Sequence, residues 1–222
     1  MTIEVATKDT TALSDAELAE MSDMCAQGPV GFELGMLSKH AQDWVLVSQA
    51  RDDDELVGFS FATLERIGGT PSLLVGLAAC ASDGRQEVVM MAMLAEHYAK
   101  ALLAFPDEDV LFATRLTGPA GFRIFEGLSD IVPRPGHKAS GEERAWGRRL
   151  AKRFGADGRI DDRSFVVEGS GSPVPCFAFG GPSPSAMDTA SLFESLDVSR
   201  GDCLVAFGWA MAEDLAANLL PR

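Results

Sequence analysis

The chain has 222 residues, of which 46% are hydrophobic, and it carries 33 acidic against 19 basic side chains for a formal net charge of -14. This length suits one large domain or one domain with an extension, and the apolar fraction is sufficient for a sizeable core. So acidic a chain is poorly suited to nucleic acid or an anionic membrane as its main partner, because both are polyanions.

The cysteines give no sign of a metal site. Cys25, Cys80, Cys176 and Cys203 lie far apart, and no CxxC or Cys/His spacing of a zinc site is present. The N-terminus, MTIEVATKDT, lacks the basic and apolar regions of a secretory signal. No apolar run approaches the ~20 residues needed to span a bilayer. We therefore expect a cytoplasmic protein with reduced thiols, no metal and no membrane partner.

The N-terminal part of the chain predicts a strand, two helices and a three-strand meander. TIEVAT alternates as a strand does, and Ser14 with Glu17 forms the Ser-x-x-Glu capping box of a helix over residues 15–26. A second short helix is expected near residues 31–40. DWVLVSQA, ELVGFSFATLERI and PSLLVGLAAC are rich in β-branched or aromatic residues. Their short links, RDDD and GGT, have turn composition, which predicts antiparallel pairing.

Two details of the meander carry structural meaning. Gly58 and Gly76 interrupt the second and third strands, where glycine marks a bulge or a close approach of backbone. The acidic run from Asp52 to Glu55 lacks the glycine and the distal glutamate of an EF-hand loop. We therefore expect this run to be a solvated turn and not a metal site.

A long amphipathic helix of about five turns follows and ends before Pro106. Glu87, Glu96, His97 and Lys100 fall outside its expected buried face. That face consists of Val88, Met91, Ala92, Ala95, Tyr98, Ala99 and Leu102. The strand DVLFAT comes next, and a proline at the first helical position opens a short helix in PAGFRIFEGL.

The last third of the chain has a different character. Ser140 and Glu143 form a second capping box, which opens the helix GEERAWGRRLAKRFG. A strand in RSFVVEG, a loop over residues 169–185, a helix in DTASLFESL, a strand in DCLVAFGW and a helix in MAEDLAANLL follow. We expect residues 136–222 to be a C-terminal extension or subdomain, or to add elements to the sheet of the preceding part.

The order of elements over roughly residues 2–135 resembles the GCN5-related N-acetyltransferase superfamily. The resemblance implies an α/β (α+β) fold with a mixed, mostly antiparallel sheet flanked by helices, and a first domain over residues 1–135. It also implies transfer of an acyl group from acetyl-CoA, or another acyl-CoA, to an amine. In that superfamily the pantetheine arm lies in a gap between neighbouring central strands, which implies that Leu77, Ala79 and Thr114 contact it.

In the same superfamily, the loop before the long helix holds the pyrophosphate with the pattern Arg/Gln-x-x-Gly-x-Gly/Ala. In this chain Asp83 stands at the leading position, Gln86 at the first glycine and Val88 at the second small residue. Only Gly84 and Arg85 resemble an intervening glycine and basic pair. The resemblance thus implies Gly84, Arg85 and Gln86 as cofactor-binding residues.

The same loop has an alternative interpretation that needs no ligand. Asp83 would cap the long helix, and the carboxylate of Glu87 in its first turn would complement the helix dipole.

The catalytic residues that the resemblance implies are altered. Phe125 stands where family members carry a tyrosine that protonates the departing thiolate, so we place Phe125 beside the cofactor without that role. Glu65, near the end of the second meander strand, is a candidate general base or a solvated hairpin residue. His40 and His97 are expected to be ordinary, partly buried residues, and His137 is a weaker candidate for a cleft.

Five basic residues surround the apolar stripe of the helix that starts near Glu142. Between Arg134 and Arg163 the chain has nine Lys/Arg against five Asp/Glu, a local excess of 9 - 5 = +4. Such a helix either docks on the acidic remainder of the chain or forms an anion site, and it could assist the altered loop only if it lay near Arg85.

We therefore predict an acetyltransferase-like protein with acyl-CoA as small-molecule partner and an unknown amine as acceptor. The alternative is a catalytically inactive protein that keeps this scaffold for binding or assembly, and a third is a soluble α/β domain of unrelated function. Nucleic acid is not expected as a partner, and the sequence leaves a homodimer open.

Overall fold

The computed structural model describes residues 3–26, 32–171, 189–218 and 220. The predicted loop over residues 169–185 and Cys176 lie mostly or wholly outside these ranges. The strands are β1 (Ile3–Asp9), β2 (Leu46–Asp52), β3 (Glu55–Ile67), β4 (Thr70–Cys80), β5 (Val110–Leu116), β6 (Ser129–Val132), β7 (Ile160–Asp161), β8 (Val166–Val167) and β9 (Cys203–Ala210). The α-helices are α1 (Asp15–Ala26), α2 (Leu34–Asp43), α3 (Gln86–Ala104), α4 (Gly141–Arg153) and α5 (Ala212–Ala217). The 3₁₀ helices are η1 (Thr10–Ala12), η2 (Pro119–Phe125), η3 (Ala190–Leu192) and η4 (Val198–Arg200).

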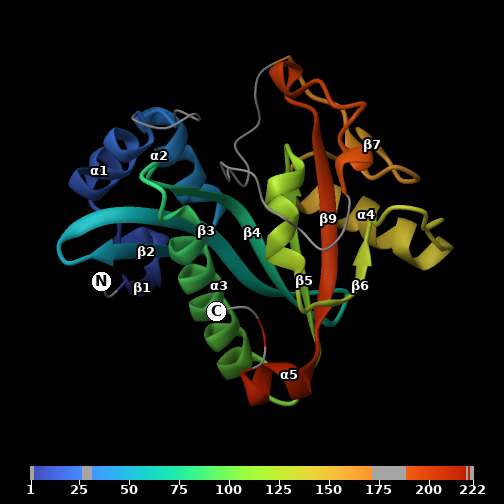
Figure 1. Ribbon diagram of the computed structural model, residues 1–222, viewed down its shortest axis with the longest axis horizontal. Helices are drawn as coiled ribbons and strands as arrows, with labels where there is room; N and C mark the ends of the chain where they lie inside the picture. The colour runs from blue at the N-terminus through green and yellow to red at the C-terminus, as the bar shows by residue number, and fades with distance from the viewer. Residues whose placement is uncertain (1–2, 27–31, 172–188, 219, 221–222) are drawn as a thin grey trace.

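The described strands form one nine-stranded sheet in the order β1-β2-β3-β4-β5-β9-β8-β7, and β6 also pairs with β9. β4 and β5 are parallel, whereas the other neighbours are antiparallel. Figure 1 shows α3 in front of the sheet and α4 behind β9. The predicted α/β (α+β) class, with a mixed and mostly antiparallel sheet flanked by helices, is confirmed.

Both glycines in the meander lie where the backbone approaches a neighbouring side chain. A Cβ on Gly58 would lie 2.5 Å from Cγ1 of Val89 on α3, and a Cβ on Gly76 would lie 2.0 Å from the ring of Trp44. The pairing of β3 with β4 also shifts register at Gly76, which is a β-bulge. The three-strand meander and its predicted close approaches are therefore confirmed.

Local capping signals place two helices correctly. The amide of Glu17 donates to Oγ of Ser14 over 3.3 Å, and the amide of Ser14 donates to Oε2 of Glu17 over 3.0 Å. The reciprocal bonds between Ser140 and Glu143 are also present at the start of α4. The helix expected near residues 31–40 is displaced and spans Leu34–Asp43, and the one at Pro119 is a 3₁₀ helix.

The predicted buried face of α3 was partly wrong, since Met91 and Tyr98 are buried as predicted but other members of that face are not. Val88 is 53% exposed, whereas His97, expected to lie elsewhere, is 1% exposed. The residues that are buried are Val89, Met90, Met91, Met93, Leu94, His97, Tyr98 and Ala101. The sequence of α3 is apolar around most of its circumference, so its period does not fix the rotation of the helix. Gly58 fixes it, because the missing side chain admits Val89 and Met93.

The C-terminal elements are shorter than predicted, except for one strand. β9 lies between β5 and β8, and its pairing with β5 runs from Leu204 opposite Leu116 to Ala210 opposite Val110. The strand expected in RSFVVEG is reduced to Val166–Val167, and the helix expected in DTASLFESL to a turn of 3₁₀ helix. The division into two domains stays a prediction.

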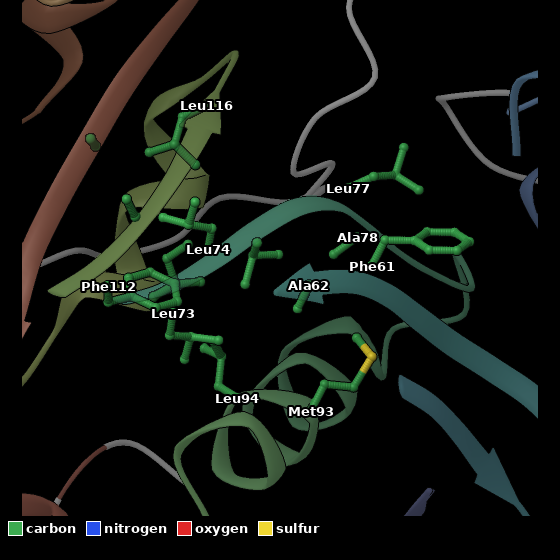
Figure 2. Packing of buried hydrophobic residues seen from close by; sticks show 14 of the residues in the cluster. Phe61, Ala62, Leu73, Leu74, Leu77, Ala78, Met93, Leu94, Phe112 and Leu116 are labelled. Atoms are coloured by element: carbon green, nitrogen blue, oxygen red, sulfur yellow. The ribbon is translucent and has the colours of Figure 1, made fainter. Parts of the chain in front are cut away.

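The core lies between the central strands and α3. Leu73 of β4 and Phe112 of β5 are fully buried, and Figure 2 shows them on the side of the strands that faces Leu94 of α3. Among the described residues, no helix combines the length and apolar character that crossing a lipid bilayer requires.

Candidate functional site

The central feature of the site is the separation of β4 from β5. The two parallel strands pair from Ser72 opposite Leu111 to Val75 opposite Thr114, and no further. The bulge at Gly76 follows at once. Figure 1 shows the two strands diverging, and Figure 2 shows Leu77 and Leu116 far apart beyond this point. β4 continues to Cys80, so its edge facing β5 has lost its partner strand.

The residues implied for the pantetheine arm lie at this separation. Leu77 and Thr114 are fully buried and Ala79 is 5% exposed. The hydroxyl of Thr114 donates to the carbonyl oxygen of Val75 over 2.7 Å, which ties the two strands together at the last paired residue. Phe125, which was also implied as a cofactor-binding residue, is fully buried and packs against Phe112 with ring centroids 5.2 Å apart.

The loop before α3 holds its only basic residue among carboxylates. Nη1 of Arg85 lies 2.5 Å from Oδ2 of Asp52, Nη2 contacts Oδ2 of Asp83, and Oε2 of Glu55 is 3.9 Å away. The hydrogen bond from Arg85 lowers the pKa of Asp83, so that carboxylate stays ionised. The guanidinium of Arg85 is thus neutralised by side chains of the protein itself.

The interpretation of Asp83 as the helix N-cap was wrong. The N-cap of α3 is Arg85, and Oδ1 of Asp83 accepts a hydrogen bond from the amide of Arg85 over 2.9 Å. Asp83 therefore closes a turn two residues before the helix. Gly84 within that turn has φ +86°, a conformation that glycine adopts without strain. Gln86 is the first residue of the helix, and its amide has no partner within it.

A second ion pair crosses the start of α3. Nη2 of Arg123, on η2, lies 2.5 Å from Oε1 of Glu87 in the first turn of α3. Glu87 thus complements the positive end of the helix dipole, as the interpretation without a ligand required. The pair also holds a carboxylate where a phosphate would approach the amides of that turn.

On a different side of the separation, a pocket of about 260 Å³ lies between the end of α2, the end of α4 and the end of β5. Its lining residues are His40, Asp43, Trp44, Arg115, Arg153, Phe154 and Gly155. It touches the point where β4 leaves β5, because Nη2 of Arg115 donates to the carbonyl oxygen of Gly76 over 3.4 Å.

Aromatic rings hold both guanidinium groups of this pocket. Cζ of Arg115 lies 5.2 Å from the ring centroid of Phe154, and Cζ of Arg153 lies 5.4 Å from that of Trp44. The two rings are neighbours, with centroids 6.0 Å apart and planes tilted by 38°. Stacking fixes the plane of each guanidinium group.

Glu65, the predicted general base, lies against this pocket through an ion pair. Its Oε1 accepts from Nε of Arg153 over 2.5 Å. The Arg-rich helix therefore docks in part on the acidic remainder of the chain. It does not assist Arg85, because Glu65 and the partners of Arg85 lie at opposite ends of β3.

The three histidines have different environments. Burial, followed by the nearby charge of Arg115, lowers the pKa of His40 below its ordinary value of 6.5. Burial lowers the pKa of His97 to about 4, and its Nε2 lies 2.7 Å from Oγ of Ser60 inside the core. Nε2 of His137 lies 2.9 Å from Oε1 of Glu143 at the start of α4.

A further pocket of about 290 Å³ is acidic. It lies beside the loop before α3 and is lined by Glu20, Asp23, Met24, Glu55, Leu56, Ala81, Ser82 and Asp83. In the described ranges, no group of three or more His, Cys, Asp and Glu side chains is arranged to hold a metal ion.

Comparison with solved structures finds N-acetyltransferases. The ribosomal-protein-S18-alanine N-acetyltransferase from Escherichia coli is similar over 94% of this chain and 95% of its own, with 10% identity and a TM-score of 0.48. The aminoglycoside 6'-N-acetyltransferase from Enterococcus faecium is similar over 52% of this chain and 64% of its own, with 15% identity and a TM-score of 0.39. An acyl-CoA N-acyltransferase from Pseudomonas aeruginosa is similar over 57% of this chain and 84% of its own, with 14% identity and a TM-score of 0.40.

These likenesses concern the fold and assign neither a substrate nor an activity to this chain. A scan against models of protein families found no match, and a search of curated proteins found none either.

Sequence reasoning missed the pocket around Trp44 and Arg115. The apolar stripe predicted for the helix that starts near Glu142 consists of Trp146, Leu150 and Phe154, and all three are buried. Nothing in that stripe indicates that Phe154, the C-cap of α4, meets a residue of β5. The signal that was present is Gly76, because a glycine inside a buried strand predicts a bulky neighbour.

Proposed function

We propose that the chain is an acyltransferase that passes an acyl group from acyl-CoA to an amine. The observation that supports this proposal best is the separation of β4 from β5 beyond Val75 and Thr114, close to the N-terminal turn of α3. The unpaired edge of β4 offers amide and carbonyl groups to an extended chain that itself contains amides, as a pantetheine arm does.

In this proposal each part of acyl-CoA has a counterpart in the chain. Leu77, Ala79 and Thr114 border the arm, and the small side chain of Ala79 leaves space beside the strand. The amides of Gly84 and Gln86, and those that follow in the first turn of α3, face the pyrophosphate, where the helix dipole favours an anion.

Acyl-CoA supplies a thioester, whose thiolate is a tolerable leaving group. Phe125 has no proton to donate, so water protonates that thiolate. Glu65 as the base that takes the proton of the amine stays part of the proposal.

A second candidate function has support from the charges of the site. Arg85 is neutralised by Asp52 and Asp83, and Glu87 places a further carboxylate at the start of α3. These charges oppose the binding of a polyanion. A non-catalytic protein that uses the same scaffold for binding or assembly would show this arrangement without penalty.

Titration with acetyl-CoA and with CoA, followed by calorimetry and by the thermal unfolding midpoint, distinguishes the two functions. A ligand of the folded state raises the midpoint once its concentration exceeds Kd. The proposal predicts saturable binding of both. It also predicts that ADP, which has the pyrophosphate but no pantetheine arm, binds at least tenfold more weakly, because the gap between β4 and β5 contributes to the affinity.

Two results of these titrations would contradict the proposed acyltransferase function. If CoA at millimolar concentration neither releases heat nor raises the midpoint, the separation of the strands is not a cofactor site. The non-catalytic function would then stand. If ADP binds as tightly as CoA, the chain holds a nucleotide without using the gap, and the proposal is wrong in its central point.

A further inference from the structure

The pocket of about 260 Å³ described above is lined by groups of both charges. Arg115, which is 6% exposed, and Arg153 supply two guanidinium groups, and Asp43 at the end of α2 supplies a carboxylate. The C-terminal end of a helix carries a partial negative charge, which adds to that of Asp43. The lining of the pocket therefore includes groups that favour an anion and groups that favour a cation.

The guanidinium of Arg153 retains hydrogen-bonding capacity. Its Nε is used by Glu65, whereas no described residue forms a hydrogen bond with its Nη1 or Nη2. Stacking on Trp44 holds the plane of this group. A preorganised guanidinium edge matches a carboxylate, which can accept two parallel hydrogen bonds.

Size limits the ligand further. Sites for drug-sized ligands have volumes of roughly 300 Å³ and above, so the pocket suits a smaller molecule. A molecule of the size of one amino acid fits this volume.

We propose that this pocket binds a small zwitterion of the amino-acid class, with its carboxylate on Arg153 and Arg115 and its amine toward Asp43. Binding of the zwitterion follows from the charges and size of the pocket alone. Its role as acyl acceptor rests on the proposed function, and it has a geometric basis, since Arg115 contacts the carbonyl of Gly76 where β4 leaves β5.

As acceptor, the amino acid would react in its uncharged amine form, after the ammonium has lost one proton to solvent. The nitrogen attacks the thioester carbonyl carbon, and the C–N bond forms as the C–S bond breaks. The nitrogen then gives up its second proton to a neutral base at the pocket, and the CoA thiolate takes one from water. For an acceptor in this pocket that base is His40 in place of Glu65, because His40 lines the pocket whereas Glu65 is paired with Arg153. The imidazole of His40 is neutral at pH 7, because burial and Arg115 lower its pKa.

The test is calorimetric titration of the full chain, without CoA, using the common L-amino acids added singly. We expect at least one to bind saturably. For L-leucine, as an example, 3-methylbutylamine lacks the carboxylate and 4-methylpentanoate lacks the amine. Analogues of this kind should bind at least about tenfold more weakly than the parent amino acid, because each lacks the partner of one charged group of the pocket.

A matched pair of variants on α4 connects the binding to the pocket. Arg153→Gln should lower the affinity for the amino acid by about tenfold or more, since a charge-assisted pair with its carboxylate is lost. Arg149→Gln is the control, because Arg149 stacks on Trp146 with 5.0 Å from Cζ to the ring centroid and does not line the pocket. If Arg153→Gln does not fold, Asp43→Asn at an exposed position is the alternative variant. It should weaken the binding of the amino acid and leave the affinity for 4-methylpentanoate unchanged.

Three results would overturn the proposal. They are no saturable binding of any common amino acid, equal binding of the amine that lacks the carboxylate, or equal affinity of the Arg153→Gln and Arg149→Gln variants. The proposed function fails separately, through CoA. If the chain binds an amino acid but not CoA, the zwitterion pocket is supported and the acyltransferase function is wrong. If the chain binds CoA but no amino acid, the acyltransferase function is supported and the zwitterion pocket is wrong.

Discussion

Gly76 has the most consequences for the site of any single residue. It is the bulged residue of β4, its carbonyl oxygen accepts from Arg115, and the ring of Trp44 occupies the space of its missing side chain. The separation of β4 from β5 and the pocket beside Trp44 therefore meet at one glycine. A side chain there would have to displace a buried ring.

We expect Gly76→Ala to lower the free energy of unfolding by about 2 kcal/mol, because overpacking of a filled core costs roughly 1–3 kcal/mol. Strand propensity alone favours alanine over glycine and would give the opposite sign. Equilibrium denaturation with urea measures the change.

The control for this variant is Gly35→Ala. Gly35 lies in α2, is exposed, and would have no atom within 4 Å of an added Cβ. Neither glycine has a positive φ, so the comparison isolates the contact with Trp44. Gly35→Ala should be neutral or stabilising by up to about 1 kcal/mol. Equal effects of the two variants would show that Trp44 does not restrict position 76.

At the scale of elements, the start of α3 decides whether an anion can bind. Its amides and its dipole favour a phosphate, while Glu87 and Asp83 oppose one. Arg123, on η2, is held by Glu87 at 2.5 Å and is the cation best placed to change partners. The ion pair between η2 and α3 thus competes with a pyrophosphate for the same position.

We predict that Glu87→Gln tightens the binding of CoA by about tenfold. The substitution removes a like charge from the phosphate site and releases Arg123, and a charge-assisted hydrogen bond of this kind is worth roughly 1.4 kcal/mol or more. Isothermal titration of CoA measures the affinity.

Glu96→Gln on the same helix is the matched control. Glu96 lies about two and a half turns after Glu87 on α3 and pairs with Lys100 over 3.3 Å, away from the first turn of the helix. This variant should leave the affinity for CoA unchanged. Weaker binding by Glu87→Gln would mean that the carboxylate supports the site, and the phosphate would have to lie elsewhere.

At the scale of the molecule, the C-terminal part of the chain completes the sheet. All seven residues of β5 are buried, and β9 covers the edge of β5 that faces away from β4. Without β9 a hydrophobic central strand would become an unprotected edge, which promotes aggregation.

We therefore expect a chain that ends at residue 135 not to unfold cooperatively, although residues 1–135 contain all the elements of the resemblance. Far-ultraviolet circular dichroism during heating and binding of a hydrophobic dye measure this. A chain that ends at Ala210 is the control, since it loses only α5 and the last residues and keeps β9. A cooperative transition in the shorter chain would support an independent first domain.

Several features of the fold could be predicted from sequence because their causes are local. The capping boxes at Ser14 and Ser140 involve residues three positions apart, and the meander follows from strand-forming segments joined by short links of turn composition. Gly58 and Gly76 indicated close approaches without saying which side chain approaches. The rotation of α3 could not be predicted, because its apolar residues surround most of the helix.

The sequence by itself determined the two capped helices, the three-strand meander and the extent of the long helix, since each follows from periodicity and turn chemistry along the chain. The mixed sheet and the loop for an anion were implied by the family resemblance, and anion binding at that loop stays a prediction. Only the tertiary structure decided how the charges are used. Arg85 meets Asp52 from 33 residues away, and Arg153 meets Glu65 from 88 residues away. Pairs of this kind depend on which strands and helices become neighbours, and no local pattern records that choice. For this reason the altered loop was visible in the sequence, whereas its neutralised arginine and the pocket beside Trp44 were not.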